Sequence, residues 1–252
     1  PRPAGYAMLT PELRIGRVVL DLGVDPRWRG RGVGSALLRR ARERARALGA
    51  AVLHGSALVG GPGEEFLRRH GLTPVRLHQE MRWDGDALPP VELPPGCVSR
   101  PMARGEEATL TALQNAAFDG SWGFCPNTVE EVAYRVGMRS VTRPEAVRFV
   151  VCGGTPVAYC WTWLRPGRGG PHGVVSMVGS HPGHRGVGLG RAALLLGMHY
   201  LRGRGAAHIE LTVDAANTPA VALYRSLGFR PVREVRWYEA RLDAHPSWPP
   251  DG

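Results

Sequence analysis

The chain contains no lysine, so all 32 of its basic side chains other than histidine are arginines. The resulting formal net charge of +10 would by itself suggest a polyanionic partner. Absence of lysine indicates a composition bias, however, and the arginines are spread along predicted helices in the manner of a solvated face. An example is the series Arg39, Arg40, Arg42, Arg44 and Arg46. A nucleic-acid partner is therefore not expected.

A long apolar run is also missing. The longest one, around residues 192–201, has about half of the roughly 20 residues that a membrane helix needs. No charged segment followed by an apolar one opens the chain. We expect a cytoplasmic protein that has no membrane partner and is a monomer or a homodimer.

Cysteine is scarce, and its spacing matches no metal-binding motif. The four residues are Cys97, Cys125, Cys152 and Cys160, and none stands in a CxxC or Cys/His pattern of the kind that holds zinc. A chain of 252 residues is large enough to bury a core without disulfides. We predict reduced thiols and no metal site.

The most informative feature that is present is an internal repeat. Residues 18–26 lead into a loop at 29–34 and later into Gly-Leu-Thr-Pro-Val-Arg at 71–76. Residues 174–182 lead into a loop at 185–190 and later into Gly-Phe-Arg-Pro-Val-Arg at 228–233. Strand, glycine loop, helix, strand, short helix and strand thus follow one another twice, which predicts two related α/β units.

The periodicity within each copy supports that order. Short β-branched runs at 18–24 and 174–178 predict strands. Apolar residues at helical spacing predict helices at 33–48 and 189–204, each ending at a glycine, and further strands follow at 51–58 and 207–213. We predict two mixed-sheet domains in tandem, separated by a Pro-rich linker at 88–96 with the sequence LPPVELPPG.

The two copies are not equally complete. After the linker we expect a strand at 97–101, helices near 106–118 and 128–138, and strands at 146–152 and 156–164, which makes 97–252 a complete domain. The first copy, 1–87, has only a strand-like segment at 5–9 before its glycine loop. It is therefore predicted to be a partial domain, with residues missing from its front.

Both loops fit the pattern Arg-x-x-Gly-x-Gly. Small residues allow the backbone to turn tightly, so that the first N–H groups of the following helix point at a phosphate group. The pattern is neither the Rossmann fingerprint nor a P-loop, which need G-x-G-x-x-G and Gly-Lys-Ser/Thr. It resembles instead the acetyl-CoA signature of the GCN5-related N-acetyltransferases (GNAT), and Asn217 to Phe229 resembles that family's second signature.

This resemblance implies roles for individual residues of the second copy. The strand residues Val178, Gly179 and Ser180 are expected to offer their backbone to the pantetheine arm, and Asn217 to bond the same arm. Tyr224 is expected to be the general acid that protonates the departing CoA thiolate. The pyrophosphate is expected on Arg185, Gly186, Val187, Gly188, Leu189, Gly190 and Arg191.

The first copy keeps the loop but not the chemistry. When the copies are aligned, Leu67 stands where Tyr224 does and Gly60 where Asn217 does. We interpret it as a degenerate module that either holds CoA or keeps the turn as a relic. Its candidate cofactor residues are Leu22, Val24, Arg29, Gly30, Arg31, Gly32, Val33 and Gly34.

The resemblance implies an enzyme that transfers an acetyl group from acetyl-CoA to an amine, by direct attack in a ternary complex. A non-catalytic acyl-CoA-binding protein is the alternative. An amine needs a proton acceptor, and the candidates are Glu130, Glu131, His172, His181, Glu210 and Asp214.

The acceptor is less determined by the sequence. The tandem layout resembles the family of mycothiol synthase, which acetylates the cysteinyl amine of a glucosaminyl-inositol thiol. That family has Lys, Glu and Tyr where this chain has Trp163, Val174 and Thr212. We therefore expect a different small amine as acceptor, with acetylation of the cysteinyl amine as the alternative.

Overall fold

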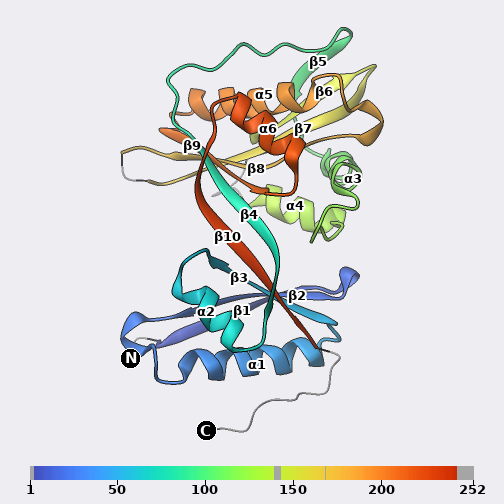
Figure 1. Cartoon of the computed structure of the whole chain (residues 1–252). Helices are drawn as coiled ribbons and strands as arrows, with labels where there is room; N and C mark the ends of the chain where they lie inside the picture. Colours follow the sequence, from blue (N-terminus) through green and yellow to red (C-terminus); the bar gives the residue numbers. More distant parts are fainter. Residues whose placement is uncertain (1–2, 139–142, 168, 243–252) are drawn as a thin grey trace. The chain divides into compact units, whose positions relative to one another are not determined.

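The computed structural model describes residues 3–138, 143–167 and 169–242. These residues form a mixed α/β structure with one ten-stranded sheet, in the order β1-β2-β3-β10-β4-β9-β8-β7-β6-β5. The predicted α/β class is thereby confirmed (Figure 1). Among the described helices, none is both long enough and apolar enough to cross a membrane.

Contacts divide the chain into two compact units that are discontinuous in sequence. The first contains residues up to Gln79, Asp214–Ala216 and the residues from Arg233 onward, and the second contains Glu80–Val213 and Asn217–Val232. Strands β4 (Thr73–Trp83) and β10 (Arg230–Arg241) each contribute to both units. The division of the sequence at 88–96 remains a prediction of domain limits.

The first unit is built from the first copy of the repeat and from the end of the chain. Its own elements are β1 (Gly5–Glu12), β2 (Arg17–Val24), α1 (Val33–Ala47), β3 (Val52–Leu58) and α2 (Pro62–Arg69), with short 3-10 helices at Leu13–Ile15 and Pro26–Trp28. The pairing of Val235 to Arg241 with β3 is antiparallel. Tyr238 and Ala240 of β10 thereby enter the core with Val18, Leu38 and Leu53.

The second unit contains the fuller set of elements that the sequence predicts. They are β5 (Cys97–Pro101), α3 (Glu107–Phe118), α4 (Val129–Gly137), β6 (Val147–Cys152), β7 (Thr155–Arg165), β8 (His172–Ser180), α5 (Leu189–Gly203), β9 (His208–Asp214) and α6 (Thr218–Ser226). Short 3-10 helices lie at Pro144–Ala146 and Pro182–His184. The predicted strands and helices of this half are confirmed to within a few residues.

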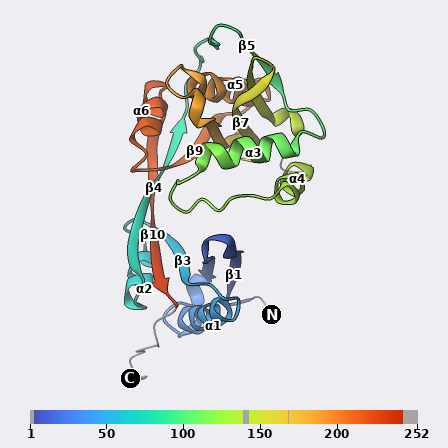
Figure 2. The same cartoon turned by 90° about the vertical axis from the view of Figure 1, so that its right-hand side faces the viewer.

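Helices cover both faces of the second unit's sheet. Alternate residues of β9, such as Ile209 and Leu211, pack beneath α5, while Phe149, Tyr159 and Trp161 belong to a second cluster beneath α3 and α4. Figure 2 shows α3 and α4 together on one side of the strands. Successive side chains along a strand point to opposite faces of the sheet. Each strand of this unit can therefore place side chains on both faces.

The prediction of four reduced thiols is wrong for two of them. Cys97 and Cys152 are partners in the antiparallel ladder of β5 and β6, with their Cα atoms 4.2 Å apart, and they form a disulfide. This cross-strand pairing places the two side chains within bonding reach. Cys125 and Cys160 are free.

The Pro-rich segment packs on the second unit. Leu88, Val91 and Leu93 lie against the core beneath α5, and His199 Nε2 of α5 lies 2.8 Å from the Pro89 carbonyl oxygen. The segment is thus a fixed part of this unit's surface.

Candidate active site

Two parallel strands of the second unit separate part-way along their length. The β8–β9 ladder joins His172, Gly173 and Val174 to His208, Ile209 and Glu210, and in the described part of the chain it ends at that last pair. Farther along β8, Val178 and Ser180 are paired with β7 on the other side. Their backbone edge toward β9 is therefore outside the described ladder, which suits the predicted pairing with an extended ligand arm.

The glycine loop leads directly into α5. Gly186 and Gly188 have φ values of 86° and 85°, a left-handed conformation that glycine adopts without strain. Gly188 is the N-cap residue, and no side chain of the described chain caps this helix end. The first N–H groups of α5 are thus left for an anionic group, which the helix dipole also favours.

The remaining predicted loop residues differ in what they contact. Arg185 donates from Nη2 to the carbonyl oxygen of Ala117 at 2.8 Å, which ties the loop to the end of α3. Leu189 is buried in the core, whereas Val187 is exposed. Arg191 lines a cavity of about 290 Å³ together with Val187, Gly188 and residues of the Pro-rich segment.

Gly179 serves a packing role as well. A Cβ atom there would lie 2.9 Å from the Cβ of Ala117 and 3.2 Å from the ring of Phe118. Only glycine therefore permits α3 to approach this part of β8 so closely. The strand and α3 are positioned together next to the loop.

Tyr224 and Asn217 lie on and before α6. Asn217 is the N-cap residue, and its side-chain oxygen accepts from the backbone N–H of Ala220 at 3.2 Å. Tyr224 is 8% exposed, and burial, with a smaller contribution from nearby Cys160, raises the pKa of its hydroxyl above the ordinary tyrosine value. Its hydroxyl group is therefore protonated at neutral pH, as a general acid must be.

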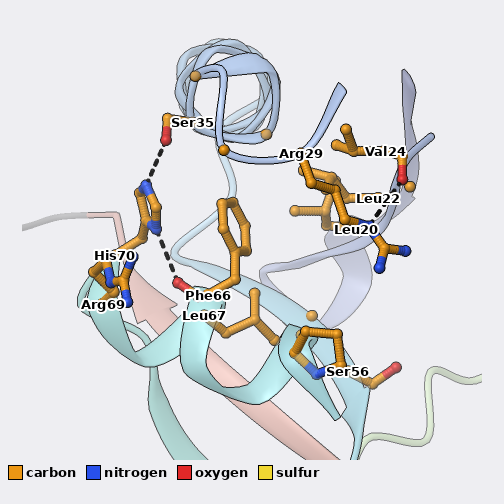
Figure 3. Close-up of a pocket in the computed structure, with 17 residues that line it drawn as sticks. Leu20, Leu22, Val24, Arg29, Ser35, Ser56, Phe66, Leu67, Arg69 and His70 are labelled. Atoms are coloured by element: carbon orange, nitrogen blue, oxygen red, sulfur yellow. Dashed lines mark hydrogen bonds between the residues drawn. The ribbon is translucent and has the colours of Figure 1, made fainter. Parts of the chain in front are cut away.

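The first unit has an open cavity of about 550 Å³ at the corresponding place. The parallel pairing of β2 with β3 joins 17–20 to 52–55, and the cavity is lined beyond it by Leu22, Gly23 and Val24, with Ser56 opposite. Figure 3 shows the labelled residues around the cavity. Leu67 stands on its wall, at the position that Tyr224 has in the second copy.

Most of the first copy's predicted residues line this cavity. Leu22, Val24, Arg29, Gly30, Gly32 and Gly34 do so, and Gly30 and Gly32 have φ values of 73° and 78°. Arg31 and Val33 are not lining residues, and the Arg31 guanidinium lies 5.3 Å from the centre of the Trp28 ring. The loop is folded like its counterpart in the second unit.

A polar pair in this cavity was not predicted from the sequence. Ser35 Oγ lies 2.8 Å from His70 Nε2, and His70 Nδ1 lies 2.8 Å from the Phe66 carbonyl oxygen (Figure 3). If Nδ1 carries the proton, as that carbonyl requires, Nε2 accepts from the serine. The two residues are 35 positions apart, and no spacing in the sequence signals their meeting.

Comparison with known proteins decides the family. The model of the acetyltransferase (GNAT) family matches residues 1–58 and 108–229. The chain belongs to the GNAT acetyltransferase family. It is therefore an enzyme of the acyltransferase class. Members of the GNAT family use an acyl-CoA donor.

Several relatives of this GNAT protein are mycothiol acetyltransferases. A mycothiol acetyltransferase from Thermomonospora curvata is 34% identical over 234 residues, which cover 90% of this chain and 75% of the relative. A mycothiol acetyltransferase from Acidothermus cellulolyticus is 33% identical over 249 residues, covering 91% of this chain and 73% of the relative.

Solved structures agree on the tandem GNAT fold. The GCN5-related N-acetyltransferase from Sphaerobacter thermophilus superimposes with a TM-score of 0.75 at 26% identity, over 95% of this chain and 77% of that one. A tandem GNAT protein from the clavulanic acid biosynthesis pathway gives a TM-score of 0.73 at 21% identity, over 96% of this chain and 80% of that one. The predicted tandem GNAT architecture is confirmed.

The candidate bases of this acetyltransferase have very different surroundings. Glu131 is engaged in a capping box with Thr128 at the start of α4, and Glu130 is exposed beside it. His181 caps the 3-10 helix at Pro182–His184, and Asp214 is ion-paired with Arg76 at 2.8 Å. Of the six candidates, only His172 and Glu210 belong to the described β8–β9 ladder, His172 in its first pair and Glu210 in its last.

No metal site accompanies these groups. Within 3–138, 143–167 and 169–242, no three or more His, Cys, Asp or Glu residues are arranged to hold a metal ion.

Proposed function

We propose that this GNAT acetyltransferase transfers an acetyl group from acetyl-CoA to the primary amine of a small molecule, by direct attack of the amine in a ternary complex. The supporting observation is the buried, protonated Tyr224 in the same unit as a glycine loop that leads into an uncapped helix. Together they suit a thioester whose leaving thiolate requires a proton.

The donor is proposed to lie along β8 and the start of α5. The backbone of Val178, Gly179 and Ser180 would pair with the pantetheine arm, and Asn217, whose side-chain oxygen already caps α6, would donate from its amide nitrogen. The pyrophosphate would accept from the N–H groups of Gly186 to Gly190, with Arg191 nearby. Arg185 would act by holding the loop against α3.

The reaction needs no acyl-enzyme. The amine nitrogen attacks the thioester carbonyl carbon, the carbon–sulfur bond breaks, and Tyr224 protonates the thiolate. A general acid of this kind contributes typically about 10²–10⁴ in rate. A protein that only binds acyl-CoA would have no use for that proton.

The first unit is proposed to bind an acyl-CoA or CoA molecule without transferring it. Its cavity of about 550 Å³ is large enough for part of such a ligand. Leu67 supplies no proton where Tyr224 would. Its contribution would then be structural or regulatory.

The acceptor is proposed to be a small amine other than the mycothiol precursor, the glucosaminyl-inositol thiol whose cysteinyl amine mycothiol synthase acetylates. Trp163, Val174 and Thr212 stand where the family of mycothiol synthase has Lys, Glu and Tyr, and the first two cannot make the same polar contacts. The cysteinyl amine of that precursor remains the second candidate. It is favoured by relatives named mycothiol acetyltransferase that are 33 and 34% identical to this chain.

The test is calorimetry of acetyl-CoA binding to the full chain, followed by release of free CoA with a panel of primary amines that includes the mycothiol precursor. We expect amine-dependent thiol release, fastest with an amine other than that precursor. Binding without release for any amine would favour the acyl-CoA-binding alternative. Absence of binding would overturn the donor assignment, and ordinary turnover of the precursor would overturn the acceptor assignment.

A further inference from the structure

Polar side chains gather along the paired part of β8 and β9, from His172–His208 at its start to Glu210, which borders the gap between the two strands. Two rows of ladder partners cross the sheet there, Arg165–His172–His208 and Trp163–Val174–Glu210. Partners in a row have their side chains on the same face. Because Ile209 and Leu211 pack beneath α5, His208 and Glu210 lie on the opposite face.

Glu210 is the centre of this cluster. Its carboxylate accepts a hydrogen bond from Arg165, and Arg82 Nη1 is 4.0 Å from Oε1. The same Oε1 atom lies 3.2 Å from His208 Nε2. The side chains of His208 and Glu210 are 13% and 20% exposed, so both are largely shielded from water.

One ring nitrogen of His208 makes no hydrogen bond with the described residues. Its Nε2 atom is buried and has no hydrogen-bond partner among the described residues, because the contact with Glu210 lacks hydrogen-bond geometry. The His172 ring is packed against it, with centroids 4.0 Å apart. A buried polar atom without a partner is uncommon and costly, and calls for a group that satisfies it.

The surroundings keep His208 neutral. Burial lowers the pKa of its imidazole, and neighbouring His172 and Arg82 lower it further, while Glu210 and Asp84 act in the opposite direction. A pKa below the ordinary histidine value leaves the ring uncharged at neutral pH. The ring can then accept a proton there, and the carboxylate beside it stabilises the resulting imidazolium.

We propose that His208 is the catalytic base of the acetyl transfer, that Glu210 positions it, and that the ammonium group of the acceptor donates to both side chains. An ammonium group has three N–H donors, enough for both Nε2 and the carboxylate. Val174, the ladder partner of Glu210, has no ionisable group. Among the three described β8–β9 pairs, Glu210 and the two histidines are the groups able to accept a proton.

The chemical step rests on the proposed function. One ammonium N–H bond breaks and its proton goes to His208 Nε2. The nitrogen lone pair forms the bond to the thioester carbonyl carbon, the carbon–sulfur bond breaks, and the thiolate takes its proton from Tyr224. The new amide nitrogen returns a proton to Tyr224, and His208 releases its own to solvent.

Kinetics test the catalytic role. His208→Gln should lower kcat/KM for the fastest amine of the panel by about 10²–10⁴ at neutral pH. The deficit should shrink as pH rises, because solution then supplies more unprotonated amine. Glu210→Gln should give a smaller loss and shift the acidic limb of the pH profile to lower pH, because the carboxylate that favours the imidazolium is gone. A loss in His208→Gln that is equal at every pH would indicate a structural role and overturn the proposal.

A matched control is available on the other face of the sheet. His199 of α5 bonds the Pro89 carbonyl oxygen, so His199→Gln should leave the pH profile unchanged. All variants should bind acetyl-CoA with unchanged affinity in calorimetry.

A binding measurement needs no turnover. In the full chain saturated with CoA, n-butylammonium chloride should shift the side-chain NMR signals of His208 and not those of His199. No shift at His208, in protein that binds CoA, would overturn the proposed ammonium site. Failure of CoA binding itself, or of acetyl transfer to every amine, would instead count against the proposed function.

Discussion

Cys97 and Cys152 face each other across the edge pair of strands in the second unit and are joined by a disulfide that closes a separation of 55 residues. A crosslink of this span restricts the unfolded chain, which is typically worth about 2–4 kcal/mol. The disulfide is therefore expected to stabilise the folded state of the unit that carries Tyr224.

Removing this bond should destabilise the protein without changing the active site. Cys97→Ser with Cys152→Ser should lower the free energy of unfolding by about 2–4 kcal/mol in urea titration. Cys125→Ser, at a free and partly exposed thiol, should have little effect and is the control. Four reactive thiols in the unfolded, unreduced wild type would contradict the disulfide.

Tyr224→Phe should abolish most turnover and leave donor binding intact. Loss of the proton donor should lower kcat by about 10²–10⁴. Donor binding should survive because the phenylalanine ring can still pack near Phe229, as the tyrosine ring does at a centroid distance of 6.0 Å. The control is Tyr200→Phe, at a tyrosine of α5 that we assign no role. An unchanged kcat in Tyr224→Phe would eliminate the hydroxyl as proton donor.

The raised pKa of Tyr224 has a consequence for the pH profile. Since the acidic form persists above the ordinary tyrosine pKa, kcat should not fall at alkaline pH until that value is passed. Stopped-flow measurement of thiol release across the alkaline range checks this. A decline centred below the ordinary tyrosine pKa would show that another group limits the reaction.

Gly32→Ala and Gly188→Ala form a matched pair that separates the two glycine loops. Both glycines have left-handed backbone, at φ of 78° and 85°, and an added Cβ would meet nothing within 4 Å. Each substitution therefore introduces backbone strain of about 1–3 kcal/mol and little else. Gly188→Ala should weaken acetyl-CoA binding and raise KM, whereas Gly32→Ala should remove a second calorimetric site and leave kcat unchanged. The reverse pattern would place the active donor site in the first unit.

Low pH should reduce the folding stability of the first unit because it protonates the Glu64 carboxylate. The Gly60 backbone N–H and the Tyr238 hydroxyl both donate to this carboxylate and lower its pKa. Because the folded-state pKa is below the unfolded one, the stabilisation is present above the ordinary glutamate pKa and is lost as pH falls through the lowered value. Glu64→Gln should flatten the acid side of a stability–pH curve. An equally steep curve in the variant would assign that dependence to other groups.

The sequence predicted what depends on local pattern. Strand and helix periodicity, the two glycine loops, and the alignment of Leu67 with Tyr224 all follow from comparing the two copies. The pairing of β10 with β3 joins residues about 180 positions apart, and nothing in either strand's alternation identifies its partner.

The contacts missed by the sequence depend on register and on chain segments meeting in space. The Cys97–Cys152 pairing requires the register of β5 on β6, and the contact of Ser35 with His70 requires the end of α2 to meet the start of α1. For His208 and Glu210, the sequence offers only two polar residues on alternate positions of a strand. The proposal for them depends on the contacts with His172 and Arg165, which only the folded sheet brings about.

The most direct test of the account is mass spectrometry of the products formed from deuterium-labelled acetyl-CoA and the amine panel, with wild type and Tyr224→Phe side by side. We predict a labelled N-acetyl amine and free CoA from the wild type, and far less of both from the variant at equal donor occupancy. If the wild type binds the labelled donor but yields no labelled amide from any amine, the chain is a binding protein and the proposed catalysis is wrong.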